Sequence, residues 1–288
     1  MESNYSATTD DFEAVEEALG YVFDPKLNYI FKDKHYLKKI SVIGFDSKFM
    51  YIWSFRKLKN FLSSKSDSGK YFMYKISHNI KINNIDRAGW RAGIWPLSIN
   101  EYLPSELQGN DFDKPKISGS LMGDFINIQR TIKGDENNPY VTRESYLATV
   151  IHEFGHAYFR QYKNWWYSNK KHNLDLLREA LLIYKNSNKK TTIGIEIPFP
   201  YLFSEIFAFC CEHEASKIFL PLHKINLDKY AIEVISKGLR YEKQKNLDLE
   251  DSIISNNFSH EASLALGMII IDRFPKTWPN KILKNFQI

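Results

Sequence analysis

Cysteine is scarce in this 288-residue sequence, which contains only Cys210 and Cys211, side by side. Neighbouring cysteines seldom bond to each other, so a disulfide framework is excluded. A chain without disulfides is typical of a reducing compartment. Residues 1–11 are polar and acidic, unlike a secretory signal peptide. We therefore expect a cytoplasmic protein whose two thiols are buried and structural.

Long hydrophobic runs are missing as well. The most apolar C-terminal stretch, residues 264–271, is too short for a membrane span, which needs about 20 apolar residues. The net charge is +5, but the lysines are spread along the chain, as is typical of solvated loops. There is no glycine-rich phosphate loop and no serine nucleophile motif. The sequence thus indicates neither a membrane nor a nucleic-acid partner, and it leaves the oligomeric state open.

Apolar residues, in contrast, make up 43% of the chain and aromatic residues 15%, which suffices for a substantial core. Residues 11–19 predict a short acidic helix that Gly20 ends and that Asp10 or Asp11 caps.

Two later stretches give different signals. Residues 45–62 are densely apolar and aromatic, a pattern that leaves helix and strand undecided. Residues 71–85 alternate more regularly and predict a strand.

Between residues 124 and 158 the sequence predicts a strand, a turn and a helix in succession. Isoleucines alternate in residues 124–132, as they do in a strand, and residues 134–139 combine Gly, Asp, Asn and Pro in a turn. Thr142 is a suitable N-cap for the next element. Apolar residues recur at helical spacing in residues 146–158, so the helix is amphipathic.

This helix contains His-Glu-Phe-Gly-His at residues 152–156. His152 and His156 are four residues apart and off the apolar stripe, so a helix projects both imidazoles from one face. Two imidazole nitrogens placed in this way reach one Zn²⁺ ion at about 2.0–2.1 Å. Glu153 is then positioned as general base for a water whose pKa the zinc lowers to about 7. The pattern predicts one zinc ion and a hydrolytic reaction.

Zinc in a catalytic site needs a third protein ligand. Glu205 lies in an apolar stretch, residues 200–215, where a buried carboxylate is costly unless it is paired or binds a metal. Glu212 follows seven residues later on the same helix face, as a ligand or as a partner that orients a histidine. His213 is the one other histidine close enough in sequence to compete. We expect Glu205 to be the ligand and leave Glu212 open.

These motifs resemble those of the gluzincin metallopeptidases, in which His-Glu-x-x-His is followed by a distant glutamate on a second helix. Residues 152–157 (His-Glu-Phe-Gly-His-Ala) are similar to the active-site helix of the thimet oligopeptidase and oligoendopeptidase F group. Residues 200–212 resemble the second motif of that group, and residues 202–208 are similar to a segment of aminopeptidases of the N type. The resemblance covers about residues 117–215.

The resemblance implies an α+β, predominantly helical fold, with a zincin-like catalytic domain, a small sheet and an active-site helix carrying the motif. It implies that Glu205 is the third zinc ligand and that Glu153 is the base. It further implies an edge strand, here residues 124–132, that binds an extended peptide by strand addition.

The chain departs from that pattern in two ways. His156 and Glu205 are 49 residues apart, longer than usual in those families, and the excess includes a predicted helix at residues 173–184 and a strand at residues 191–197. Such an insertion would cover the cleft and limit substrate size. The oligopeptidases also use a late histidine and tyrosines to stabilise the oxyanion, and here His260 is the candidate donor, with no tyrosine following it.

The sequence therefore predicts a zinc-dependent metallopeptidase that acts on a peptide or protein substrate. Residues 101–288 are expected to form the catalytic domain, and residues 1–100 a region of undefined role. Two alternatives stay open. One is a metal-dependent regulatory or toxin-like protein that acts on a single partner, and the other is a catalytically inactive zincin-like binding module.

Overall fold

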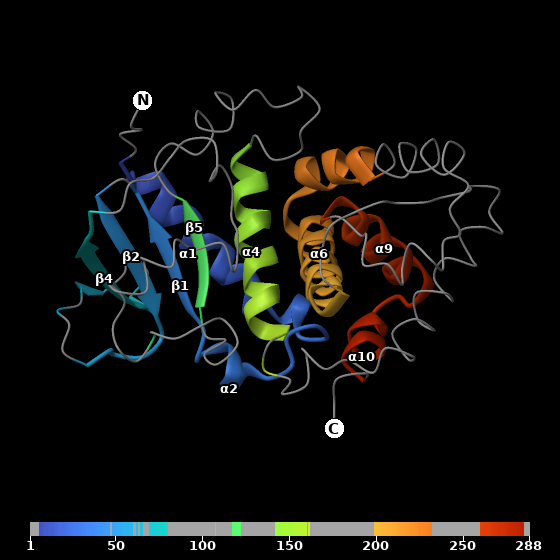
Figure 1. Ribbon diagram of the computed structural model, residues 1–288, viewed down its shortest axis with the longest axis horizontal. Helices are drawn as coiled ribbons and strands as arrows, with labels where there is room; N and C mark the ends of the chain where they lie inside the picture. Colours follow the sequence, from blue (N-terminus) through green and yellow to red (C-terminus); the bar gives the residue numbers. More distant parts are fainter. Residues whose placement is uncertain are drawn as a thin grey trace. The chain divides into compact units, whose positions relative to one another are not determined.

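The computed structural model describes residues 6–46, 48–59, 62, 64–65, 69–79, 107, 117–121, 142–159, 161, 199–231 and 260–284. They belong to two compact units, Met1–Gln161 and Tyr162–Ile288 (Figure 1). Over these ranges the protein is mostly helical with a small sheet, so the expected α+β class is confirmed. The elements predicted at 124–132, 173–184 and 191–197 lie outside the described residues. No helix in the described ranges is long and apolar enough to cross a membrane.

The first unit contains a five-stranded sheet in the order β3-β4-β2-β1-β5. Its strands are β1 (Ser41–Phe45), β2 (Phe49–Ser54), β3 (Ser64–Lys65), β4 (Phe72–Ser77) and β5 (Ile117–Leu121). Neighbours are antiparallel except β5, which pairs with β1 in parallel. A parallel pair needs a long crossover, and here the chain between the two strands includes β2, β3 and β4. The strand predicted within residues 71–85 is confirmed as β4.

Strand β2 is buried on both faces, which explains why the sequence of this region shows no clear alternation. Met50 and Ile52 face one side of the sheet, and Tyr51 and Trp53 face the other. The ring of Phe12 packs against the second side, with centroids 4.9 Å from Tyr51 and 5.9 Å from Trp53. Because Phe12 belongs to the first helix, that helix covers the Tyr51 face of the sheet.

The first helix, α1 (Thr9–Val22), confirms the helix predicted at residues 11–19 but is longer at both ends. Its N-cap is Thr8, not an aspartate. Asp11 stands at the third helical position, where its carboxylate accepts hydrogen bonds from the Thr8 backbone N–H (2.7 Å) and hydroxyl (2.8 Å). This is a capping box, in which the acidic residue completes the cap from inside the helix. Gly20 lies within the helix, which ends at Val22.

Described residues on both sides of position 100 share one core. Helix α1 packs against α4 (Arg143–Phe159), and β5 completes the sheet that β1 and β2 begin. The first compact unit therefore extends to Gln161.

The turn between β1 and β2 is held by the carboxylate of Asp46, which is 2% exposed. One carboxylate oxygen accepts from the backbone N–H groups of Lys48 (2.8 Å) and Phe49 (2.7 Å). The other accepts from the Ala7 backbone N–H (2.9 Å) and the Tyr51 hydroxyl (3.0 Å). A buried carboxylate with four donors is fully satisfied, so it fixes the turn and ties the start of the chain to the sheet.

We expect Asp46→Ala to lower the free energy of unfolding by about 3 kcal/mol or more, because four donors lose a buried charged acceptor at once. Chemical denaturation followed by circular dichroism measures the loss. Asp24→Ala is the matched control, since Asp24 accepts a single exposed bond from the Lys26 N–H (2.8 Å) and is expected to cost about 1 kcal/mol or less. Equal losses in the two variants would contradict the role given to Asp46.

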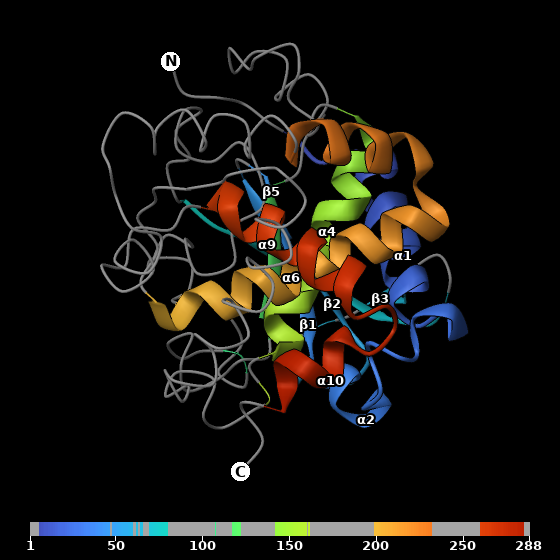
Figure 2. The same ribbon diagram turned by 90° about the vertical axis from the view of Figure 1, so that its right-hand side faces the viewer.

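The second unit is helical in its described part. It consists of α6 (Phe199–Phe219), a helical segment at residues 221–231, α9 (His260–Arg273) and α10 (Trp278–Leu283). Helices α6 and α9 lie side by side in both views (Figures 1 and 2). They approach closely at Gly267, where an added Cβ would lie 3.2 Å from the sulfur of Cys210. Both cysteines are free and buried, as expected.

Candidate metal centre

Helix α4, which carries the His-Glu-Phe-Gly-His sequence, begins as the sequence predicts. The Thr142 hydroxyl accepts from the Ser145 N–H (3.1 Å), and the Ser145 hydroxyl accepts from the Thr142 N–H (2.9 Å). These reciprocal bonds form a capping box with serine in place of the usual acid. Thr142 is therefore confirmed as the N-cap.

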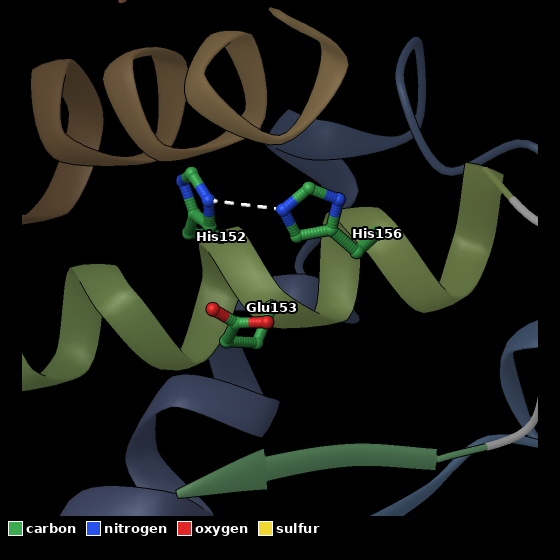
Figure 3. A group of neighbouring side chains, drawn as sticks. All are labelled: His152, Glu153 and His156. Carbon is green, nitrogen blue, oxygen red and sulfur yellow. Dashed lines mark hydrogen bonds between the residues drawn. The ribbon is translucent and has the colours of Figure 1, made fainter. Parts of the chain in front are cut away.

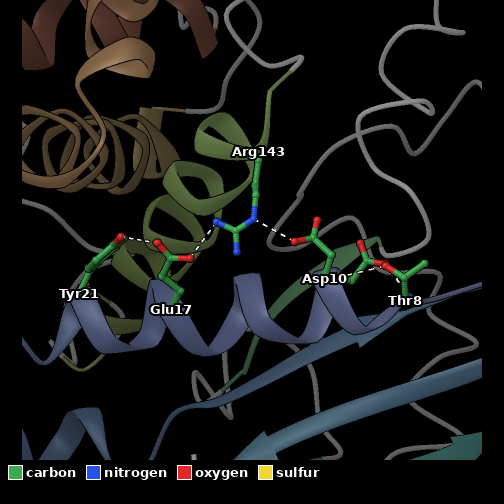
Figure 4. Close-up of polar contacts among 6 residues, drawn as sticks. Thr8, Asp10, Glu17, Tyr21 and Arg143 are labelled. Atoms are coloured by element: carbon green, nitrogen blue, oxygen red, sulfur yellow. Dashed lines mark hydrogen bonds and ion pairs between the residues drawn. The ribbon is translucent and has the colours of Figure 1, made fainter. Parts of the chain in front are cut away.

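Ion pairs connect the N-terminus of α4 to α1. Arg143 reaches Asp10 (3.0 Å) and Glu17 (2.8 Å), and Tyr21 donates to Glu17 (Figure 4). Burial alone would lower the pKa of Arg143, but its bonds to the two acids outweigh burial and leave that pKa above its ordinary value. Burial and then the bond to Glu17 raise the pKa of Tyr21 to about 12. These contacts fix the start of the helix against the first helix of the chain.

Polar side chains form a buried stripe along one face of α4. Ser145, Thr149, His152 and His156 follow the three- and four-residue spacing of a single helix face, and none is more than 9% exposed. The Thr149 hydroxyl donates to the Ser145 carbonyl (2.8 Å), so the first part of the stripe is internally bonded. The stripe thus places both histidines on one buried face of the helix.

The two histidines have the geometry of a metal-binding pair. Their Nε2 atoms are 3.2 Å apart, and the side chains are 4% and 5% exposed. Two nitrogens at that separation, each about 2.05 Å from one ion, subtend about 103° at it, near the tetrahedral value of about 109°. The residues present therefore fit zinc. Figure 3 shows both rings of His152 and His156 on one side of the helix.

Glu153 completes the group. It is 3% exposed, and one of its carboxylate oxygens lies with the two histidine nitrogens in a cluster whose atoms are all within 4.8 Å of one another. It projects from a neighbouring side of the helix (Figure 3), so the carboxylate stands beside the imidazole pair instead of in line with it. Among the residues that the structure describes, this is the one group of three or more side chains suited to hold a metal ion.

Glu205 and Glu212 both lie on α6, in the second unit, but their surroundings differ. Glu205 is half-buried, next to the fully buried Ile206. Glu212 is 1% exposed, and its Oε1 is 2.8 Å from Nε2 of His223, which is completely buried. Glu212 is therefore the more deeply buried of the two, and one carboxylate oxygen of Glu205 is buried as well.

Compared with protein-family models, curated proteins and solved structures, the chain has no significant match.

Two other candidate residues, His213 and His260, lie on α6 and α9. His213 contacts Asp228 (3.4 Å) and Glu214 (3.9 Å). Burial by itself would lower the pKa of His213, but these carboxylates outweigh burial and raise that pKa. His213 is thus engaged within the second unit. His260 is the first residue of α9, and its side chain lies outside the described part of the chain.

The pairing of Glu212 with His223 could not be found from the sequence. The two residues are eleven positions apart and lie on successive helices, on either side of Leu220. No periodicity joins residues across such a helix junction, so only the fold brings them together. A histidine one helix after two glutamates is the available signal in the sequence, and it is not specific.

Proposed function

We propose that this protein is a zinc-dependent metallopeptidase that hydrolyses peptide bonds in a peptide or protein substrate. The observation that carries the proposal is the buried pair of His152 and His156, whose Nε2 atoms are 3.2 Å apart with Glu153 beside them. Two imidazoles four residues apart on a helix, with a carboxylate beside them, are the ligand types that a catalytic zinc site uses. A carboxylate next to the metal-binding pair is also where a general base is needed.

In this proposal His152, His156 and Glu205 hold the zinc ion, which supplies Lewis-acid chemistry when bound. Glu153 is the general base, whose carboxylate accepts a proton from the attacking water and returns it to the leaving amine. His260 is assigned the role of the hydrogen-bond donor that stabilises the oxyanion. The proposal includes a zincin-like fold, which is supported by the packing of the motif helix against β5, the outermost described strand on one side of the sheet.

The choice of Glu205 over Glu212 is supported by the partner of Glu212. A carboxylate oxygen that is 2.8 Å from a buried histidine nitrogen already has a role in the packing of the second unit. Glu205 is half-buried, and the resemblance of residues 200–212 to the second gluzincin motif assigns the ligand to its position.

The substrate is proposed to be a peptide or a protein, aligned by strand addition along residues 124–132. The cytoplasmic location is also part of the proposal, supported by the two free, buried cysteines.

The test is metal-dependent cleavage of a mixed peptide library, read by mass spectrometry. Zinc content of the purified protein is measured first, and the library is then exposed to the zinc-loaded protein, to protein stripped by a chelator, and to stripped protein with zinc restored. We expect cleavage in the first and third samples and none in the second. The cut sites then define the side-chain preference.

Three results would go against the proposal in distinguishable ways. Protein that binds no zinc would remove its basis. Zinc binding with no cleavage of any peptide or protein would indicate an inactive binding module. Cleavage of one protein partner, with the library left intact, would indicate the regulatory or toxin-like alternative.

A further inference from the structure

The last two turns of α4 rest on residues 31–37, near the beginning of the chain. The ring of Phe31 meets Phe154 and Tyr158 edge-on, with centroids 6.1 and 5.2 Å apart. Tyr36, in the short helix α2 (Lys34–Leu37), meets the ring of Tyr158 edge-on at 6.1 Å. Phe31, Phe154 and Tyr158 are at most 1% exposed, so this contact is part of the core of the first unit.

Two hydrogen bonds reinforce the aromatic contact. The Asp33 backbone N–H donates to the hydroxyl oxygen of Tyr158 (3.1 Å). The Tyr36 hydroxyl donates to the Ala157 carbonyl (3.4 Å). Ala157 is among the last four residues of α4, whose carbonyls have no donor within a regular helix. Residues 31–37 therefore also cap the end of the motif helix.

The position of this contact on the helix matters for the histidines. Phe154 follows His152 by two residues and Tyr158 follows His156 by two, so each aromatic ring lies nearly opposite a histidine on the helix surface. A shift or rotation of the last turns at Tyr158 moves His156, while His152 lies one turn closer to the fixed N-terminal end. The contact with residues 31–37 therefore holds the same last turns of the helix that carry His156.

We propose that Tyr158 is a positioning residue for His156, held by residues 31–37, and that it sets the geometry of the metal-binding pair. This inference rests on the proposed function, since it concerns the same histidines. It also gives the first part of the chain a role in the site, because Phe31, Asp33 and Tyr36 supply the contacts.

Tyr158→Phe tests the inference, because it removes one hydroxyl and leaves the ring. Tyr74→Phe is the matched control. The Tyr74 hydroxyl accepts from the Leu58 N–H (2.6 Å), and Tyr74 and Tyr158 are each 1% exposed, but Tyr74 lies on β4 away from α4. Zinc affinity is measured by competition with a chromophoric chelator. The visible absorption of the Co²⁺-substituted protein reports the ligand geometry independently of activity.

We expect Tyr158→Phe to weaken zinc binding roughly threefold to tenfold, as for residues that act through a packed network, and to shift the Co²⁺ bands. Tyr74→Phe is expected to lower the melting temperature by a similar amount and to leave zinc affinity and the Co²⁺ spectrum unchanged. If Tyr158→Phe does not fold, Tyr36→Phe takes its place, since it removes the bond to Ala157 from a half-buried side chain and leaves the ring.

The possible outcomes distinguish the positioning role of Tyr158 from the proposed metallopeptidase function. A wild-type protein that binds zinc, with both variants equal to it, overturns the positioning role and leaves the metallopeptidase proposal standing. Equal losses of zinc affinity in the Tyr158 and Tyr74 variants also overturn it, because a general loss of folding stability then explains the weaker binding. A wild-type protein that binds no zinc overturns both.

Discussion

Glu153→Gln is expected to reduce kcat for peptide cleavage by about 10²–10⁴-fold, the usual contribution of a general base, while zinc stays bound. Glutamine has the shape and volume of glutamate, so the buried site, where Glu153 is 3% exposed, keeps its packing. Its amide does not accept a proton from water at neutral pH. Steady-state rates on one peptide from the library, together with zinc content by elemental analysis, measure the two quantities separately.

Glu144→Gln is the matched control for that variant. Glu144 lies in the first turn of the same helix, so the substitution changes the same charge on the same element, away from the histidines. Its activity should stay within about twofold of the wild type, because removal of an acid from a first helical turn costs only about 0.3–1 kcal/mol of stability. A loss of less than tenfold in Glu153→Gln would argue against a general base. Parallel loss of zinc would make Glu153 a ligand.

Glu205→Ala is expected to weaken zinc binding by at least about a hundredfold. Loss of a residue that only orients a ligand typically costs 10–100-fold in affinity, and loss of the ligand itself should exceed that range. The comparison is with Glu212→Gln, which keeps a carbonyl oxygen to accept from His223 and so keeps the buried pair of the second unit together. We expect Glu212→Gln to retain zinc within about tenfold. Chelator competition measures both variants.

The reverse pattern would overturn the choice of ligand. If Glu205→Ala binds zinc like the wild type while Glu212→Gln loses it, Glu212 is the ligand and His223 the residue that orients it. Circular dichroism is needed for each variant, because a destabilised α6 lowers zinc affinity whichever glutamate binds. His152→Ala serves as the positive control for full loss of a ligand.

The part of the site that the sequence predicts is the part contained in one helix. Thr142, the apolar spacing after it and the two histidines lie within 15 consecutive residues, so helical geometry alone fixes their relation. The structure confirms the cap and places the histidine nitrogens 3.2 Å apart. The role of Glu153 and the identity of the third ligand stay predictions.

The sequence is less informative wherever contacts join distant segments. The helix at the start of the chain is recognisable from the sequence, but acidic residues alone point to Asp10 or Asp11 as its cap. In a capping box the acid stands three positions after the cap, and here the Asp11 carboxylate accepts from Thr8. The region of β2 was undecided because burial on both faces removes the alternation that marks a strand. Tyr158 contacts residues more than 120 positions earlier in the chain, and no local sequence pattern predicts such a contact.

The orientation of α4 has an electrostatic consequence for a bound cation. The peptide dipoles of a helix add to about half a negative charge at its C-terminal end, and His156 lies in the last turn of α4. The helix field there favours a positive ion by about 0.3–1 kcal/mol, and more where the surroundings are buried. At the opposite end, the positive charge of Arg143 opposes the dipole, and Asp10 and Glu17 offset it. The backbone of the helix, and not only its side chains, thus favours the divalent cation proposed at His156.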